Sequence, residues 1–392
     1  MSGTLAVATM RVQQVARRDG RRAFTVLTED GRIYDIADSF LRTCSGGTDR
    51  TYAYLLVDHL RWLDFEGLSA ASVSIRDLQR YMGAVGAAYA GPFGRPWRPG
   101  KRPYAQSTLT TAAACLKRFY LHQASKGIRT DLAEELKQVR LPTLADRQRA
   151  FLGHTLTEVA SNPLTPSRSM KQRHPKLPPD NARAILTSAA STARDRMVIS
   201  WLADGGFRLG ELCGLHLMGD LHLRENAACG QCRSRHVHIC HRDTNPNGAR
   251  AKMKHSWRIE SGSVVGGLIR RVSPSMIHTY FEYMTTEYPS GVEHGMLLVQ
   301  LTSAARGQPW STAAARAMFR SVSDRAGIGK VRPHSFRHQF ATDILNASRG
   351  NTLIARDAGG WSSATTVEEI YGHTEVDDPM FSAALEKVWG TT

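Results

Sequence analysis

The chain has 392 residues, of which 42% are hydrophobic, so it is long enough to bury the cores of two or three domains. Its 51 lysines and arginines outnumber its 35 aspartates and glutamates, and the net charge of +16 favours a polyanionic partner, either nucleic acid or an acidic membrane surface. No stretch approaches the ~20 apolar residues of a membrane span, and the N-terminus lacks the apolar core of a signal peptide. We therefore expect a cytoplasmic protein without a membrane partner.

The first 45 residues predict an N-terminal arm or a short hairpin. An apolar run at 24–27 is followed by a polar turn at 29–31, and apolar residues recur at 33 and 36. A polar, glycine-containing turn between two apolar segments is typical of a β-hairpin. We expect the turn at 29–31 to join two strands.

Residues 46–140 predict a small helical domain. The spacing of apolar residues is helical at 49–67, at 74–81 and at 107–126. The segment 90–106, between the second and third of these helices, is rich in proline, glycine and arginine. This composition indicates an exposed basic loop.

The rest of the chain predicts a linker and a second, larger domain. Prolines interspersed with lysines and arginines indicate a basic linker at 141–180. Helical periodicity dominates 181–392, but 235–242 and 256–260 alternate between polar and apolar residues as strands do. The fold class that follows is α+β, mainly helical with a small β-sheet.

A histidine and an arginine near the C-terminus form the first candidate motif. In the segment PHSFRHQFAT, Pro333 suits the first turn of a helix, so that His334 and Arg337 share one helical face. A helix N-terminus that presents an imidazole and a guanidinium is suited to binding a phosphate. Alone the pair is a weak signal, because two such residues at this spacing also occur by chance.

Two further motifs flank this one in the chain. In GGFRLGELCGL, Arg208 begins a helix after two glycines that allow close backbone approach, and Glu211 can orient its guanidinium. The alternative for this pair is a surface ion pair of little consequence. In GGWSSATTVEEIYGH, a serine caps a short helix that ends near Tyr371. Taken alone, Tyr371 would be an anchor that packs a C-terminal helix.

The order of these motifs resembles the tyrosine recombinase, or phage integrase, family. The matching stretches are GGFRLGELCGL, ARAKMKHSWRIE, PHSFRHQFAT and GGWSSATTVEEIYGH. The resemblance spans about 180–375, and the helical region before it is similar to the core-binding domain of that family. It implies a site-specific DNA recombinase or integrase with a helical N-terminal DNA-binding domain and a mixed α/β catalytic domain.

The resemblance also implies a reaction. Tyr371 would attack a DNA phosphodiester, which gives a 3′-phosphotyrosyl bond and a free 5′-hydroxyl, with no metal or nucleotide cofactor required. The chemistry of the residues agrees with these roles. Arg208 and Arg337 can each bond phosphate oxygens bidentately and offset the charge of the transition state. An imidazole has an ordinary pKa of ~6.5, so His334 can bind the phosphate and transfer protons near neutral pH.

Two positions are assigned through the same resemblance. A lysine in a β-hairpin would protonate the leaving 5′-oxygen; Lys252 and Lys254 are both candidates, and alignment of the segment favours Lys252. Trp361 stands where many relatives carry histidine. Its indole N–H can donate a hydrogen bond to the phosphate but cannot transfer a proton. Trp361 is ten residues before Tyr371, one residue more than the commonest spacing.

A cysteine- and histidine-rich insertion at 222–242 is not explained by the family core. Its C-x-x-C pair is the usual zinc knuckle, and Cys240 with either His236 or His238 completes four ligands. A tetrahedral site with four protein ligands has no open position, so this Zn²⁺ would be structural. The alternative is reduced thiols beside histidines that contact DNA. The expected ligands are Cys229, Cys232, His238 and Cys240.

The expected partner is double-stranded DNA. Strand exchange between two duplexes needs four active sites, so the resemblance implies a homotetramer assembled on two DNA sites. Two alternatives stay open: a topoisomerase IB-like enzyme that nicks and reseals DNA, and a regulator that binds DNA without catalysis. Basic runs in both domains would contact phosphates, which position a protein without specifying the sequence. These runs are 17–18, 21–22, 95–102, 168–176 and 270–271.

Overall fold

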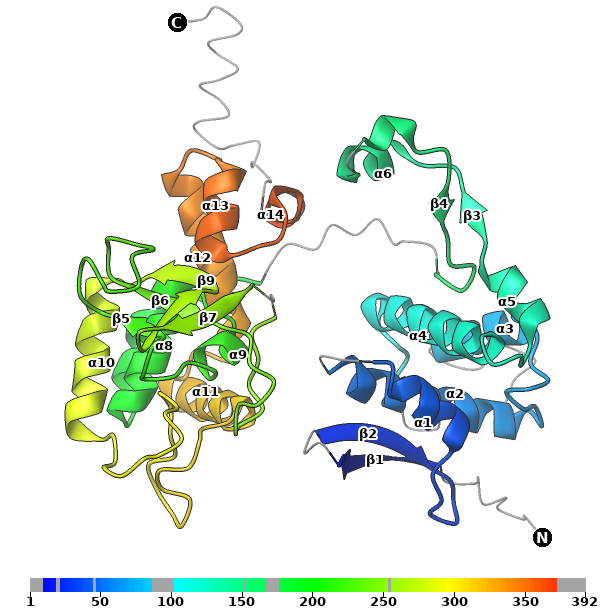
Figure 1. Ribbon diagram of the computed structural model, residues 1–392, viewed down its shortest axis with the longest axis horizontal. Coiled ribbons are helices and arrows are strands. Elements are labelled where there is room, and N and C mark those ends of the chain that lie inside the picture. Colours follow the sequence, from blue (N-terminus) through cyan, green and yellow to red (C-terminus); the bar gives the residue numbers. More distant parts are fainter. Residues whose placement is uncertain are drawn as a thin grey trace, which may run out of the picture. The chain divides into compact units, whose positions relative to one another are not determined.

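The computed structural model divides into two compact units, Met1–Lys171 and Gln172–Thr392, each with its own hydrophobic core. Both units are mainly helical with small antiparallel sheets (Figure 1), which confirms the α+β class. In the part of the chain that is described, no helix is both long and apolar enough to cross a membrane. The structure describes residues 10–18, 22–44, 47–86, 102–150, 152–166, 176–252 and 255–371. Lys254 and most of the basic runs at 95–102 and 168–176 lie outside these residues.

The N-terminal unit begins with a hairpin whose position differs from the prediction. Strand β1 (Arg11–Ala16) pairs with β2 (Arg22–Leu27), so the hairpin turn precedes the apolar run at 24–27. The polar turn at 29–31 reverses the chain, but only one isolated antiparallel bridge, between Leu27 and Ile33, forms across it in the described residues. Helix α1 (Asp35–Leu41) follows, because its buried residues recur with the spacing of a helix and not of a strand.

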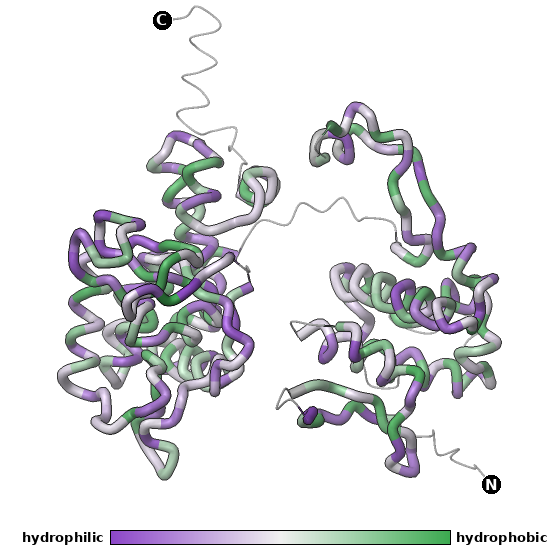
Figure 2. The backbone as a smooth tube through the Cα atoms, in the orientation of Figure 1, coloured by the Kyte–Doolittle hydropathy of each residue, from purple (hydrophilic) through white to green (hydrophobic). Residues whose placement is uncertain are grey.

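Four helices complete the N-terminal core. The three predicted helices are present as α2, α3 and α4, and a short fourth helix follows them. Green hydrophobic and purple hydrophilic stretches alternate along these helices in Figure 2, as expected for elements with one buried face. Their bounds are α2 (Thr48–Phe65), α3 (Ile75–Gly86), α4 (Gln106–Ala124) and α5 (Thr130–Leu136).

The predicted linker contains short elements in its described part. Thr143 caps a helix by accepting from the backbone N–H of Asp146, whose carboxylate accepts from the backbone N–H of Thr143 in return. Leu164 is buried in the N-terminal core, which ties this part of the chain to the first unit. Strand β3 (Val139–Arg140) directly precedes the predicted linker and pairs with β4 (Val159–Ala160) inside it. The other elements of the linker are α6 (Leu144–Arg149) and a 3₁₀ turn (Gly153–Thr155).

The C-terminal unit holds a three-stranded sheet and a two-stranded hairpin. The sheet has the order β5-β6-β9 and is antiparallel throughout, and the hairpin joins β7 to β8. Strands β6 and β7 match the predicted strands, and β5 pairs His222 with His236 across the sheet. The bounds are β5 (Leu221–His222), β6 (His236–Ile239), β7 (Trp257–Glu260), β8 (Ser263–Gly266) and β9 (Leu268–Arg271).

Eight helices surround this sheet in the described part of the unit. Helix α8 is buried at the centre, and its Trp201 donates an indole N–H to the carbonyl of Met276 on α10 at 2.9 Å. Phe336 of α12 packs against Phe319 of α11, which anchors α12 in the same core. The bounds are α7 (Ala182–Ala189), α8 (Ala193–Gly205), α9 (Leu209–Leu212), α10 (Pro274–Thr286), α11 (Thr312–Ala326), α12 (Pro333–Ala347), α13 (Thr352–Gly359) and α14 (Ala364–Tyr371).

Candidate active site

Arg337 lies on the first turns of α12, and its side chain is buried. Its Nη1 donates to the carbonyl of Gly206 and its Nη2 to that of Gly359, each at 2.7 Å. The guanidinium also lies over the indole ring of Trp361, 4.1 Å from the ring centroid. Burial, and next the positive charge of Arg208, lower the pKa of Arg337 to about 9, so it stays protonated at neutral pH. These contacts hold a positive charge in one orientation before any phosphate binds.

Arg208 is held by a buried carboxylate, as the spacing predicts. Its Nη1 donates to one oxygen of Glu211 at 2.6 Å, and its backbone N–H donates to the other at 2.9 Å. Glu211 is only 2% exposed, so this pair is not a solvated surface ion pair. Gly206 has a φ of +57°, and a Cβ there would meet the ring of Phe340 at 2.4 Å. Glycine therefore lets the start of α9 approach α12 closely.

Tyr371 ends α14 and is half-buried. Its ring packs edge-on against that of Trp361, with centroids 5.8 Å apart, and it joins a small apolar cluster with Leu345 and Val367. Burial raises the pKa of Tyr371 to about 12, although Arg337 and Arg208 both pull it down. The phenol is thus an anchor of its helix and also lies within electrostatic reach of both guanidinium groups.

His338 is part of the site although the sequence analysis does not single it out. Its Nδ1 is 2.6 Å from the hydroxyl oxygen of Tyr371, and its ring lies against that of His334, with centroids 4.5 Å apart. Burial, followed by His334 and Arg337, lowers the pKa of His338 to about 4. At neutral pH His338 is therefore neutral, and its Nδ1 can accept the hydrogen bond of the phenol when the proton of the ring is on Nε2. The available signal was the four-residue spacing from His334, which places both rings on one helical face.

His334 and Lys252 complete the set of predicted residues that are described. Burial is the largest cause that lowers the pKa of His334, and the charges of Arg337, Arg208 and Lys252 add to it. Lys252 is exposed and lies shortly before β7, outside any strand. The structure therefore brings Arg208, Lys252 and His334 into one electrostatic neighbourhood.

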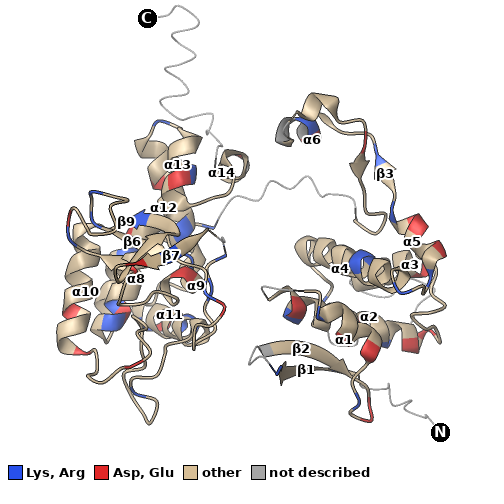
Figure 3. Ribbon diagram, viewed as in Figure 1, with Lys and Arg blue, Asp and Glu red and all other residues tan. Residues whose placement is uncertain are grey.

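A basic cavity of about 560 Å³ opens beside this group. It lies between the start of α9, helix α11 and the start of α12, and among the described residues that line it none is acidic. Lysine and arginine positions also gather near α12 and β9 in Figure 3. A cavity of this charge is suited to the phosphates of a polyanion. Its basic lining residues are Arg208, Arg316, Arg320, Lys330, Arg332 and His334.

One predicted DNA contact is instead part of the scaffold. Arg270 is 2% exposed, and its guanidinium donates to the carbonyls of Gly205, Ala358 and Gly359. Burial lowers the pKa of Arg270 to about 10. The prediction that Arg270 contacts DNA is wrong, because the side chain turns into the unit and holds the end of α13 against β9.

The predicted zinc ligands are only partly brought together. The residues that gather are His222, Cys229, His236 and His238. The expected ligands Cys232 and Cys240 are not in this group. Strand β6 ends at Ile239, and the thiol of Cys240 lies near Asp220 and Arg242 instead. The cross-strand pairing of β5 with β6 supplies His222, which no local spacing in the sequence indicates.

Comparisons with known proteins agree with the motif order. The phage integrase family model matches residues 175–377. Transposase A from transposon Tn554 of Staphylococcus aureus is 25% identical over 204 residues, which are 52% of this chain and 50% of the transposase. Tyrosine recombinase XerD of Corynebacterium glutamicum is 33% identical over 112 residues, which are 28% of this chain and 33% of XerD. The chain thus matches about half the length of the curated relatives, or less.

Two solved structures share the fold. The Tn1549 transposon integrase in complex with transposon right end DNA aligns with a TM-score of 0.54 over 91% of this chain and 98% of that chain, at 14% identity. The XerH site-specific recombinase bound to palindromic difH substrate aligns with a TM-score of 0.50 over 87% of this chain and 79% of that chain, at 13% identity. At these identities the similarity concerns the fold.

Proposed function

Because the chain belongs to the phage integrase family, we propose that it is a site-specific DNA recombinase that cleaves and rejoins strands through a 3′-phosphotyrosyl intermediate. One observation carries the proposal: the hydroxyl of Tyr371 is hydrogen-bonded to His338, and the positive charges of Arg337 and Arg208 both lower its pKa. This reaction requires a nucleophile, a proton acceptor and phosphate-binding cations in one place, which supports the proposal. The relatives named for transposons favour an enzyme of a mobile element.

Cleavage begins with the phenolic oxygen of Tyr371, which attacks the phosphorus of a DNA phosphodiester. The new bond joins this oxygen to phosphorus, and the bond to the 5′-oxygen breaks. The phenolic proton passes to Nδ1 of His338, and Lys252 gives a proton to the leaving 5′-oxygen. The 5′-hydroxyl of a partner strand reverses these steps when it attacks the phosphotyrosyl bond.

Without bound DNA, Tyr371 would stay protonated and therefore unreactive. The pKa of Tyr371, about 12, is far above that of His338, about 4, so the proton stays on the phenol. A DNA phosphate beside Arg337 and His334 adds negative charge to a group of positive ones, which raises the pKa of His338. The same charge also raises the pKa of Tyr371, and Arg337 and Arg208 offset that effect. Substrate binding would therefore strengthen His338 as the proton acceptor.

The remaining residues stabilise charge. Arg208 and Arg337 bond the non-bridging oxygens, and each is oriented beforehand by protein contacts. The indole ring of Trp361 stacks against the guanidinium of Arg337, and its N–H would donate a hydrogen bond to the phosphate. His334 donates a further hydrogen bond. These side chains supply the positive charge for the chemistry, so we propose that catalysis needs neither metal nor nucleotide.

We further propose that double-stranded DNA is bound by both units and that four chains assemble on two DNA sites. The basic cavity beside Arg208 would follow the DNA backbone, and the helical N-terminal unit would supply further contacts. A nicking and resealing enzyme would share the cleavage step. An assay with two sites on separate duplexes distinguishes the two, because only a recombinase exchanges strands between them.

The test traps the covalent phosphotyrosyl intermediate. The substrates are a set of overlapping nicked duplexes that together cover the DNA on both sides of the gene that encodes this chain. A nick near the cleavage position releases a short fragment, so the covalent adduct accumulates. We expect an adduct that survives detergent and disappears in Tyr371→Phe, while DNA binding in a gel-shift assay stays within about twofold of wild type. An adduct that persists in Tyr371→Phe, or stable binding by wild type without any adduct, would contradict the proposal.

A further inference from the structure

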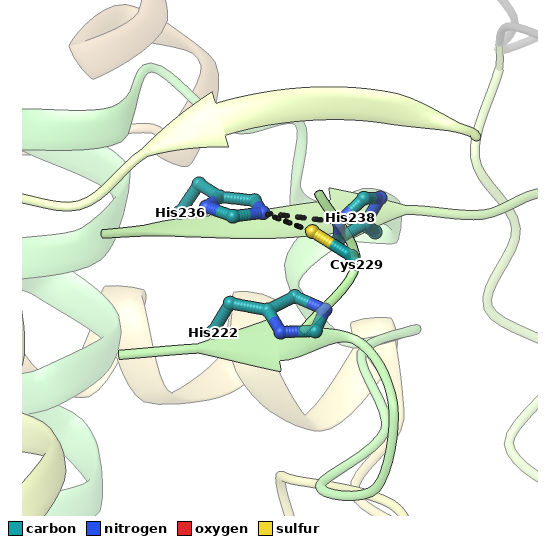
Figure 4. A group of neighbouring side chains, drawn as sticks. All are labelled: His222, Cys229, His236 and His238. Atoms are coloured by element: carbon teal, nitrogen blue, oxygen red, sulfur yellow. Dashed lines mark hydrogen bonds between the residues drawn. The ribbon is translucent and has the colours of Figure 1, made fainter. Parts of the chain in front are cut away.

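Four buried side chains point toward one another beside the sheet of the C-terminal unit (Figure 4). Their ligand atoms all lie within 4.8 Å of one another. The Nε2 atom of His236 is 3.1 Å from Nε2 of His238 and 3.2 Å from Sγ of Cys229. His222 reaches the group from β5, with its ring centroid 4.9 Å from each of the other two. We call these four residues the His/Cys cluster.

The protons of two histidines are fixed by the backbone. Nδ1 of His236 is 2.6 Å from the carbonyl of Ser234, and Nδ1 of His238 is 2.7 Å from the carbonyl of Gly266. A carbonyl oxygen only accepts, so each Nδ1 carries a proton, and an uncharged ring with its proton on Nδ1 has its lone pair on Nε2. These lone pairs face each other at 3.1 Å. Two lone pairs at this distance repel each other, but both can bind a cation that lies between them. A histidine that binds a metal through one nitrogen usually donates the N–H of the other nitrogen to a carbonyl or carboxylate, as these two do.

The third histidine has a polar atom without a hydrogen-bond partner. Nε2 of His222 is buried and makes no hydrogen bond within the described residues. A buried nitrogen in this state is unfavourable unless a ligand or a metal completes it. Cys229 is likewise buried, at 9% exposure, and its sulfur faces the histidine nitrogens and not water.

We propose that the His/Cys cluster binds one structural Zn²⁺. Zinc lies ~2.0–2.1 Å from histidine nitrogen and ~2.3 Å from cysteine sulfur, so the corners of its tetrahedron are about 3.3 Å apart for two nitrogens and about 3.6 Å for nitrogen and sulfur. The two separations given above, 3.1 and 3.2 Å, are close to these values, and the other pairs of ligand atoms lie within 4.8 Å. Three imidazoles and one thiolate suit Zn²⁺ and not Mg²⁺ or Ca²⁺, and four protein ligands leave no open position.

The ion would join three parts of the C-terminal unit. It connects β5, β6 and the loop that carries Cys229. Gly266, at the end of the β7–β8 hairpin, accepts from His238 and donates its backbone N–H to Oε1 of Gln231 at 2.6 Å. Lys252 lies just before this hairpin, so the ion would stabilise the frame from which the proposed general acid extends.

The first experiment measures metal in the purified full-length chain. We expect one zinc per chain by elemental analysis. After zinc is removed, Co²⁺ should give the intense visible bands of a tetrahedral site and a charge-transfer band from one thiolate. Weak bands typical of octahedral cobalt, a band from three thiolates, or no binding would overturn the proposal.

The second experiment separates this cluster from a C-x-x-C zinc knuckle. Cys229→Ser and His236→Gln should each weaken Zn²⁺ affinity about tenfold or more. The matched controls Cys232→Ser and Cys240→Ser should bind zinc as wild type does. Loss of zinc in either control, with zinc retained in Cys229→Ser, would overturn the assignment. If a variant does not fold, the cobalt spectrum of the wild-type chain still decides. Neither readout depends on DNA cleavage.

Discussion

The candidate active site and the His/Cys cluster lie in the same unit but are assembled in different ways. The active site gathers residues from Gly206 to Tyr371, and backbone carbonyls at the ends of α8 and α13 hold its buried arginine. The cluster takes all its residues from a short stretch, His222 to His238, and joins them through strand pairing. The active site is therefore preorganised by the core, whereas the cluster would need an ion to hold it.

Replacement of the buried arginine should have the largest effect. Arg337→Lys keeps a positive charge but cannot donate to both Gly206 and Gly359 and also bond a phosphate bidentately. We expect covalent adduct formation to slow by about 10²–10³-fold, as is usual when one preorganised donor to a transition state is lost. Single-turnover cleavage of a nicked duplex measures this rate.

The control for this variant is an arginine outside the site. Arg356 lies on α13 and forms an exposed ion pair with Asp357. Arg356→Lys should cleave at the wild-type rate, since exposed pairs contribute little. Equal losses in both variants would show that the buried arginine has no special role.

The sequence predicts the active site better than the cluster for a physical reason. Arg208, Arg337 and Tyr371 belong to motifs whose order along the chain is itself informative. His338 was missed because its partner Tyr371 is 33 residues away and comes close only when α14 packs on α12. His222 was missed because strand register, and not spacing along the chain, places it opposite His236.

The N-terminal unit shows the same limit of local patterns. The helices α2, α3 and α4 follow from apolar spacing that persists over several turns. The turn at 29–31 predicts a hairpin, but the chain makes only the bridge from Leu27 to Ile33 before α1 begins. A short apolar run fits either a strand or a helix, so tertiary packing decided the outcome.

A smaller effect is expected for the carboxylate that orients Arg208. Glu211→Gln keeps the shape and one acceptor oxygen but removes the buried negative charge. The guanidinium then loses a charge-assisted hydrogen bond, and we expect cleavage to slow by about tenfold. Tight DNA binding should persist, so the change should appear in the rate at saturating DNA. A change confined to DNA affinity would contradict a role in orientation.

The smallest effect concerns stability against acid. The pKa of His338 is lowered to about 4 in the folded chain, compared with an ordinary value of ~6.5, so unfolding lets it take up a proton between these values. Stability due to this residue is complete above pH ~6.5 and is lost as the pH falls toward about 4. Chemical denaturation at several pH values should show a shallower loss in His338→Gln than in wild type. Parallel curves would contradict the burial of a neutral His338.

The most direct test of the account is to identify the amino acid that becomes joined to DNA. The trapped adduct is digested with protease and nuclease, and the remaining nucleotide-bearing peptide is sequenced by mass spectrometry. The account predicts that the nucleotide is attached to Tyr371 through its 3′-phosphate. Attachment to another residue, or through a 5′-phosphate, would contradict it.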